Sequence, residues 1–224
     1  RSLLSTLAAH YDRVGRFQEA LDLADKALVH TPTAIEPMMI KARALKHLGD
    51  ITAAHTTLEQ ARRMDLADRY VNTQAAKMQA RIGGPEEALK IFSLFTRPEA
   101  NVLDTVQDLQ VLWFQLELGR SYERKKCLPN AIKWYSQVIK HCEDHYEDQF
   151  DFHQYCVRNG VITSYLQLLA WSNAVYREMK YVKATKGFAR CCLRLVESRS
   201  CAETEVDFSK LSAKEKKKVK AKLR

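Results

Sequence analysis

With 224 residues and 46% hydrophobic content, the chain is long enough for one or two domains with a substantial core, which excludes an intrinsically disordered protein. Its seven Gly and five Pro leave few turns, which excludes sandwich and barrel folds made of many short strands. The net charge is +9, but residues 209–224 alone carry eight Lys or Arg and one Glu, so the basic character belongs to the C-terminal segment.

No stretch of 18 or more apolar residues occurs, so neither a membrane-spanning helix nor a membrane partner is expected. The N-terminus, Arg1-Ser2-Leu3-Leu4, has neither an initiator Met nor a secretory leader, which predicts an excised soluble segment. The six cysteines include no C-x-x-C pair and are too sparse for a disulfide scaffold. We therefore expect a reducing, cytoplasmic environment.

A 34-residue period runs through the first part of the chain. Glycines recur at this spacing, and so do the alanines five residues after them: Gly15, Gly49, Gly83 and Ala20, Ala54, Ala88. A fourth copy, with Gly119 and Ala131, is displaced, because Ala131 follows Ala88 by 43 residues. Small residues let two helices pack closely, and the glycine ends the first helix in a left-handed conformation. The period is typical of tetratricopeptide repeats and predicts an all-α helical solenoid, a right-handed superhelix of antiparallel helix pairs.

The repeats divide the chain into three predicted parts. Residues 1–145 hold four repeats, at about 1–34, 35–68, 69–102 and 112–145. Residues 146–198 are expected to add helices that continue or cap the solenoid, and residues 199–224 to form a polar linker and a Lys-rich tail. Pro32 and Pro85 are expected where new helices begin. The apolar periodicity predicts helices at 2–14, 17–30, 35–48, 51–64, 69–82, 85–96, 104–126, 128–145, 150–170 and 181–198.

No motif indicates catalysis, because the sequence has no Gly-rich phosphate loop, no G-x-S-x-G and no H-E-x-x-H. His153 and Cys156 could share a helix face, but no second pair lies at zinc-site spacing, so core packing is the simpler interpretation. The three tryptophans lie among apolar residues at helical spacing, which also favours core packing: Trp113, Trp134 and Trp171.

Basic residues recur on the first helices of the repeats. Arg43 and Lys77 are 34 residues apart, Lys46 and His47 lie one turn beyond Arg43, and Arg69 opens the third repeat. Equivalent positions of stacked repeats are neighbours, so these side chains could form one basic groove that binds a polyanion. From the residues alone, a solvated basic face is the simpler interpretation, since basic residues on exposed helices are common.

The Lys-rich tail is expected to contact phosphates, with an affinity that falls with salt. Because residues 210–224 contain no aromatic side chain, sequence-specific recognition of DNA or RNA is not expected. Nonspecific contact with ribosomal RNA, a nuclear-import signal and a solubilising helix all fit. The candidate RNA-contact residues are Lys214, Lys216, Lys217, Lys218, Lys220 and Lys222.

Several runs of sequence go beyond the generic repeat. They are His30-Thr31-Pro32-Thr33, Lys41-Ala42-Arg43, Lys46-His47-Leu48-Gly49-Asp50-Ile51, Asp65 with Ala67-Asp68-Arg69-Tyr70-Val71-Asn72, and Asp148-Gln149-Phe150-Asp151-Phe152-His153 with Tyr155-Cys156 and Arg158. Together with the Lys-rich segment after Leu211-Ser212, they resemble, in the same order, the auxiliary subunits of the N-terminal acetyltransferase A complex. The resemblance covers nearly the whole chain, although residues 171–187 and 199–209 follow it poorly.

This resemblance implies a non-catalytic scaffold that wraps and activates a catalytic N-acetyltransferase subunit and docks it on the ribosome in the cytoplasm. Acetyl-CoA would be bound by that partner only, and no cofactor is intrinsic to this chain. The resemblance also implies that inositol hexakisphosphate can bind in the basic groove as a structural ligand. The matching positions here are Lys41, Arg43, Lys46, His47, Arg69 and Lys77.

Two other classes of function remain open. A stand-alone peptide-binding adaptor, such as a chaperone adaptor, would need Lys and Asn to clamp a peptide carboxylate. The matching positions hold Ser5 and Ala9, which weakens that hypothesis. An RNA-processing repeat protein would depend on the tail and the basic groove.

Overall fold

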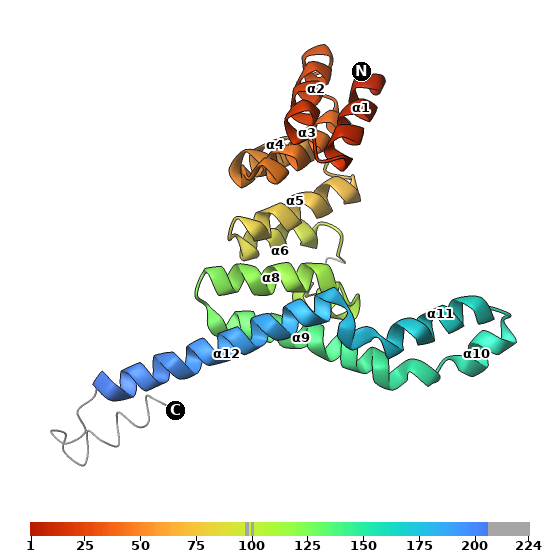
Figure 1. The fold of residues 1–224 in the computed structure, drawn as a ribbon, viewed down its shortest axis with the longest axis vertical. Coiled ribbons are helices and arrows are strands. Elements are labelled where there is room, and N and C mark those ends of the chain that lie inside the picture. The colour runs from red at the N-terminus through yellow and green to blue at the C-terminus, as the bar shows by residue number, and fades with distance from the viewer. Residues whose placement is uncertain (97–98, 100, 206–224) are drawn as a thin grey trace. The chain divides into compact units, whose positions relative to one another are not determined.

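The computed structural model describes residues 1–96, 99 and 101–205. Every regular element within these residues is a helix, which confirms the predicted all-α class (Figure 1). No helix among them is long and apolar enough to cross a membrane. The chain divides into two compact units, Arg1–Lys125 (unit 1) and Lys126–Arg224 (unit 2).

Unit 1 is built from helices that pack in chain order. Consecutive helices contact each other from α1 to α6, and α8 lies against both α5 and α6. The helices of unit 1 are α1 (Ser2–Arg13), α2 (Phe17–His30), α3 (Ile35–Leu48), α4 (Ile51–Met64), α5 (Arg69–Arg81), α6 (Pro85–Ser93), α7 (Val102–Asp108) and α8 (Leu112–Arg124).

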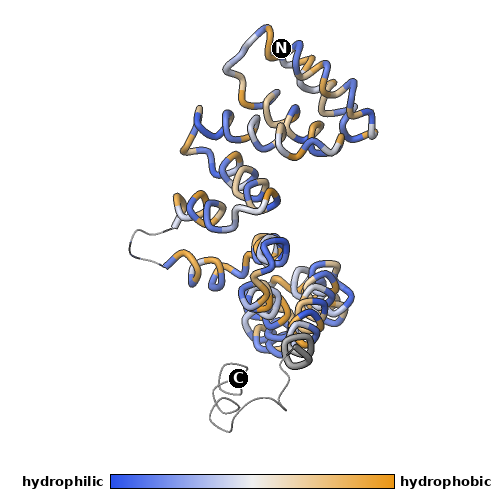
Figure 2. The backbone as a smooth tube through the Cα atoms, turned by 90° about the vertical axis from the view of Figure 1, so that its left-hand side faces the viewer, coloured by the Kyte–Doolittle hydropathy of each residue, from blue (hydrophilic) through white to orange (hydrophobic). Residues whose placement is uncertain are grey.

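The repeated glycines and alanines have the roles that the period predicts. The glycines that follow α1, α3 and α5 are left-handed, with φ of +83°, +95° and +96°: Gly15, Gly49 and Gly83. The repeated alanines are fully buried where helices meet: Ala20, Ala54 and Ala88. Hydrophobic and hydrophilic residues alternate along these helices, as amphipathic packing requires (Figure 2). Pro85 is the first residue of α6, as predicted, whereas Pro32 lies in the turn before α3.

Unit 2 is organised around α9 and α12, which pack along each other, while α11 contacts α9 and both short 3-10 helices. In Figure 1, α10 and α11 form a hairpin beyond the C-terminal end of α9. The elements of unit 2 are α9 (Leu128–Glu147), η1 (Asp148–Phe150), α10 (His153–Arg158), α11 (Ile162–Asn173), η2 (Val175–Arg177) and α12 (Met179–Glu205).

Three predicted helices differ from the structure. The single helix predicted at 104–126 is wrong, because the chain breaks between α7 and α8, where Gln110 has a φ of +47°. The helix predicted at 150–170 is divided into α10 and α11 by Gly160, which has a φ of +68°. The helix predicted at 181–198 is too short, because α12 continues through residues 199–205, which were expected to be part of a polar linker.

Candidate functional site

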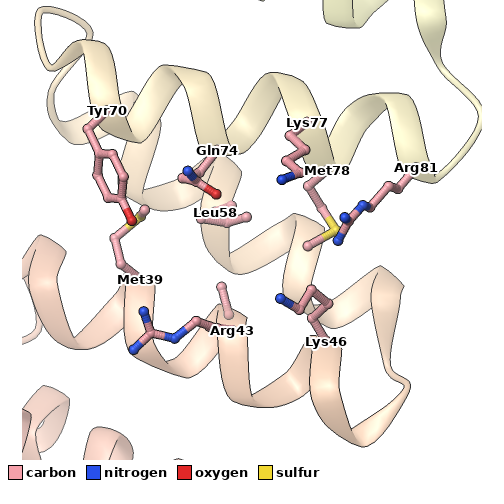
Figure 3. Close-up of a pocket in the computed structure, with 10 residues that line it drawn as sticks. Met39, Arg43, Lys46, Leu58, Tyr70, Gln74, Lys77, Met78 and Arg81 are labelled. Atoms are coloured by element: carbon pink, nitrogen blue, oxygen red, sulfur yellow. The ribbon is translucent and has the colours of Figure 1, made fainter. Parts of the chain in front are cut away.

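A hollow between α3 and α5 of unit 1 gathers positive charge (Figure 3). Its volume is about 100 Å³. We call it the cationic groove, after the charged residues that line it: Arg43, Lys46, Lys77 and Arg81. Its floor is apolar and is formed by Met39, Leu58 and Met78, among others.

The 34-residue period explains how these cations come together. Arg43 and Lys77 hold the same position in successive repeats, and equivalent faces of stacked repeats are neighbours. Lys46 lies one turn after Arg43, and Arg81 lies one turn after Lys77. Each helix therefore presents two cations to the same side, because residues three or four apart share a helix face.

The lysines of the groove are held in surroundings that disfavour their charge. Burial lowers the pKa of Lys46, and neighbouring cations, Arg81 first, lower it further despite the opposing charge of Asp12. Burial also lowers the pKa of Lys77, with Arg81 as the next cause and Glu117 opposing the shift. A bound anion would replace this repulsion between cations with attraction.

Two buried carboxylates neutralise the arginines of the groove and leave the lysines. Asp12 accepts a hydrogen bond from Nε of Arg43. Glu117 lies on the other side, with Oε1 at 3.0 Å from Nη2 of Arg81. Within the part of the chain that the structure describes, neither lysine has an acidic side chain at ion-pair distance. The groove therefore keeps a net positive charge.

Two residues of the predicted basic cluster lie away from the groove. The ammonium of Lys41 is 2.7 Å from Oδ1 of Asp25. The guanidinium of Arg69 lies 6.0 Å from the ring centre of Phe95. Arg69 was predicted in the groove because it opens the third repeat, and Lys41 because of the family resemblance. Lys41 is two residues from Arg43 and so points to the opposite side of α3.

His47 is not among the residues that line the groove, whereas Arg81, which was not predicted, is one of them. Nδ1 of His47 is 2.8 Å from Oδ1 of Asp12, and its ring lies 4.6 Å from that of Phe17. Arg81 was not among the predicted residues, although it follows His47 by 34 residues and Lys77 by one turn. Applying the 34-residue spacing to His47, as was done for Arg43, would have identified Arg81.

The tryptophans differ in their surroundings. Trp134 is 4% exposed, which confirms its predicted packing in the core. Trp113 and Trp171 are only half-buried. The Lys77 ammonium lies 5.5 Å from the ring centre of Trp113, and His145 meets Trp171 edge-on at 5.3 Å. Trp113 thus positions one lysine of the cationic groove through a cation–π contact.

The other candidate residues form no additional site. Cys156 is buried, whereas His153 is exposed with Nδ1 against the carbonyl of Phe150. Among the residues with described placement, no group of three potential ligands could hold a metal ion. The predicted RNA-contact residues lie outside the described residues: Lys214, Lys216, Lys217, Lys218, Lys220 and Lys222.

The chemistry of the cationic groove suits binding. Besides its four cations, its rim carries the phenol of Tyr70 and the amide of Gln74, both of which can donate hydrogen bonds. No carboxylate, Ser, Cys or His is among its lining residues within the described chain. The groove can therefore hold a compact ligand with several negative charges, and its apolar floor limits competition by water.

Comparison with known proteins places the chain in a family. Residues 3–224 match the family described as N-terminal acetyltransferase A, auxiliary subunit. The N-terminal acetyltransferase A complex auxiliary subunit NAA15 of Arabidopsis thaliana is 40% identical over 214 residues, which are 96% of this chain and 24% of that protein. The human protein N-alpha-acetyltransferase 16, NatA auxiliary subunit, is 34% identical over 221 residues, which are 97% of this chain and 26% of that protein.

A solved structure of Naa15/Naa10 bound to HypK-THB has a TM-score of 0.74 and 34% sequence identity, and the match covers 85% of this chain and 30% of that chain. The chain spans about a quarter of the length of the curated relatives it matches. The sequence resemblance is thus confirmed, and the chain belongs to the family of N-terminal acetyltransferase A auxiliary subunits.

Proposed function

We propose that the chain is part of a non-catalytic scaffold that binds and activates the catalytic subunit of a co-translational N-terminal acetyltransferase. The observation that carries this proposal is its similarity to the Naa15 chain of a solved Naa15/Naa10 complex, at a TM-score of 0.74. Acetyl-CoA is then bound by the catalytic partner. The scaffold acts by burying helix faces against the enzyme and holding its active site in a productive arrangement.

The same proposal includes docking on the ribosome in the cytoplasm. Its support is the Lys-rich segment 209–224, with eight Lys or Arg and one Glu. Such a segment neutralises phosphates of ribosomal RNA without reading their sequence, so its affinity falls as the salt concentration rises.

The cationic groove supports a second element of the proposal, namely a polyanion such as inositol hexakisphosphate as a structural ligand. Lys46 and Lys77 carry this element, because burial and neighbouring cations lower their pKa values and no carboxylate neutralises them in the described chain. Several phosphates on one small ring match four cations on two helices, and each phosphate can accept charge-assisted hydrogen bonds.

Reconstitution tests the scaffold function. The catalytic subunit is prepared alone and in complex with the full-length protein. Each preparation is then tested for acetylation of peptides that begin with Ser or Ala and of peptides that begin with Met-Glu. A stable complex with altered preference is expected. If the two proteins do not associate, or if the catalytic subunit acts identically alone, the proposal is wrong.

Calorimetric titration with inositol hexakisphosphate tests the groove. Lys46→Glu with Lys77→Glu should abolish binding, whereas Lys41→Glu should leave it nearly unchanged, because Lys41 pairs with Asp25 outside the groove. Equal loss in both variants would indicate a general charge effect and contradict a defined site. Circular dichroism checks that each variant keeps its helices.

The alternative of a peptide-binding adaptor receives no support from the site. Ser5, at a position where a carboxylate clamp would be needed, is fully buried. A side chain without exposed surface cannot contact a peptide in that position.

A further inference from the structure

An uncharged stretch of unit 2 is far more exposed than its composition predicts. Residues 159–176 contain no Asp, Glu, Lys, Arg or His, and they include all of α11. A helix with one exposed face normally carries charged or polar residues on that face and apolar residues on the face that packs against the core. In α11, however, Leu166 remains 59% exposed and Ile162 50% exposed.

One side of α11 is anchored to the rest of unit 2. Tyr165 is buried, and its hydroxyl donates a hydrogen bond to the Gln149 carbonyl at 3.4 Å. Ser172 is also buried, and Trp171 meets the ring of His145 edge-on. These contacts hold the hairpin against α9 and η1, so its exposed side is presented on a fixed support.

The other side of the hairpin forms a continuous apolar row. Ile162, Leu166 and Ala170 are four residues apart and are all exposed, so they lie along one face of α11. The preceding segment adds more exposed apolar side chains: Phe150, Phe152, Tyr155, Val157 and Val161. We call residues 150–170 the apolar arm. Monomeric proteins rarely expose many large apolar side chains close together unless they form an interaction site.

The apolar arm is bordered by acidic residues. Residues 141–176 contain five carboxylates against one guanidinium, a net charge of −4 with neutral histidines, in a chain whose total is +9. Four of these carboxylates are exposed at the end of α9 and in the segment that leads into α10: Glu143, Glu147, Asp148 and Asp151. We call them the acidic rim.

The charge of the acidic rim distinguishes between the possible binding partners of the apolar arm. A second copy in a symmetric contact would bring two acidic rims together, and like charges across an interface oppose association. An anionic membrane surface would repel the rim for the same reason. A polypeptide helix with an apolar face bordered by Lys or Arg satisfies both the apolar arm and the acidic rim.

We propose that the apolar arm and its acidic rim form a docking surface for a helix of the catalytic acetyltransferase chain, one that presents an apolar face flanked by basic residues. The inference rests on the proposed scaffold function and adds the surface and the chemistry of the contact. The apolar row supplies affinity, and the acidic rim steers the partner and fixes its direction along α11.

Binding of the catalytic subunit to the full-length protein, measured by biolayer interferometry, tests the proposal. Ile162→Ser with Leu166→Ser should raise the Kd at least tenfold. The matched control is Leu193→Ser with Val196→Ser on α12, whose side chains are 63% and 64% exposed in the unmodified protein, and it should leave the Kd within twofold. A Kd unchanged by the arm variant would overturn the proposal.

Charge reversal provides an independent readout. Glu147→Lys should slow association severalfold at low salt, with a smaller effect at high salt, because screening weakens steering. Glu197→Lys, an exposed reversal on α12, should not change the rate. Equal effects of the two reversals would overturn the role of the acidic rim.

Two measurements on the partner-free protein detect other occupants. If the arm variant lowers the melting temperature by several degrees, another part of the same polypeptide covers the arm. If light scattering shows a dimer that the variant dissociates, a second copy covers it. Either result would overturn the proposal. If the unmodified protein fails to bind the catalytic subunit at all, the scaffold function fails with it, whereas normal binding by the arm variant rejects this surface alone.

Discussion

The ring of Tyr135 on α9 lies directly against the backbone of Gly187 on α12. A Cβ atom at residue 187 would be 2.5 Å from Cζ of Tyr135, which is closer than real Cβ contacts allow. Both residues are buried in unit 2, so α9 and α12 approach closely only because residue 187 has no side chain.

Gly187→Ala should therefore destabilise unit 2 by about 1–3 kcal/mol, since overpacking outweighs the better helix propensity of Ala. Chemical denaturation measures the loss. In a Tyr135→Leu background, which removes the outer ring atoms, the same substitution should cost much less. If the two substitutions have additive effects on the free energy of unfolding, the contact between residue 187 and the Tyr135 ring is not the cause of the loss.

Lys77→Met should stabilise the ligand-free protein by about 0.5–1 kcal/mol, because it removes a partly buried cation that other cations repel. The pKa of Lys77 is lowered by its burial and by Arg81, which indicates this unfavourable environment. The same variant should weaken binding of inositol hexakisphosphate. Denaturation should show that the variant is more stable, and calorimetry on the same sample should show that its affinity is lower. A variant that is less stable would contradict the prediction.

Glu117→Gln should have the opposite effects, lowering stability and raising the affinity for a polyanion. It removes the charge that pairs with Arg81 at 3.0 Å, so we expect a loss of about 1–2 kcal/mol of stability. Polyanion affinity should rise severalfold, because Arg81 and the groove lose a competing negative charge. Glu59→Gln is the matched control, since Glu59 pairs with Arg62 and Arg63 on α4 outside the groove, and it should leave affinity unchanged.

Polyanion binding should depend on pH in the alkaline range. The pKa values of Lys46 and Lys77 lie below the usual 10.5 in the folded protein, and a bound anion should raise them again. Affinity should therefore fall as pH rises through the lowered pKa values, and binding there should take up protons. Calorimetry near pH 9 in two buffers of different ionisation enthalpy measures this uptake, which should vanish in Lys46→Met with Lys77→Met.

The same shifts affect stability in the absence of ligand. Between the lowered pKa values and 10.5, the unfolded chain binds more protons than the folded one. The contribution of these lysines to the free energy of unfolding thus rises with pH across that window, because the cost of burying their charge is relieved. The double Met variant should lose this dependence.

Gln110→Gly should stabilise unit 1 by about 0.5–1 kcal/mol. Gln110 has a φ of +47° between α7 and α8, a region where a side chain is strained and glycine is not. Gln60→Gly, at an exposed position inside α4, should instead cost about 1 kcal/mol. If both substitutions destabilise the protein equally, the left-handed conformation at residue 110 carries no strain.

The sequence alone predicted the structure correctly where the same residue types recur every 34 residues. The 34-residue spacing identified the left-handed glycines and the buried alanines, and it placed Arg43 and Lys77 on equivalent faces. The two helices that were predicted as continuous but are broken also have a physical explanation. The apolar period continues through residues 109–111, so nothing in the composition revealed the break at Gln110, whereas the Asn159-Gly160 pair is a turn signal that could have divided the helix predicted at 150–170.

Tertiary structure decided which charges meet. Periodicity places a residue on a face of its own helix, but whether Lys41 or Lys46 reaches the groove depends on the neighbouring helix and on acids such as Asp25 that are distant in sequence. The exposure of α11 is a similar case. Its sequence has no charged residue that would mark the outer side, and only the packing of unit 2 shows which side is covered, because burial depends on what else occupies the surrounding space.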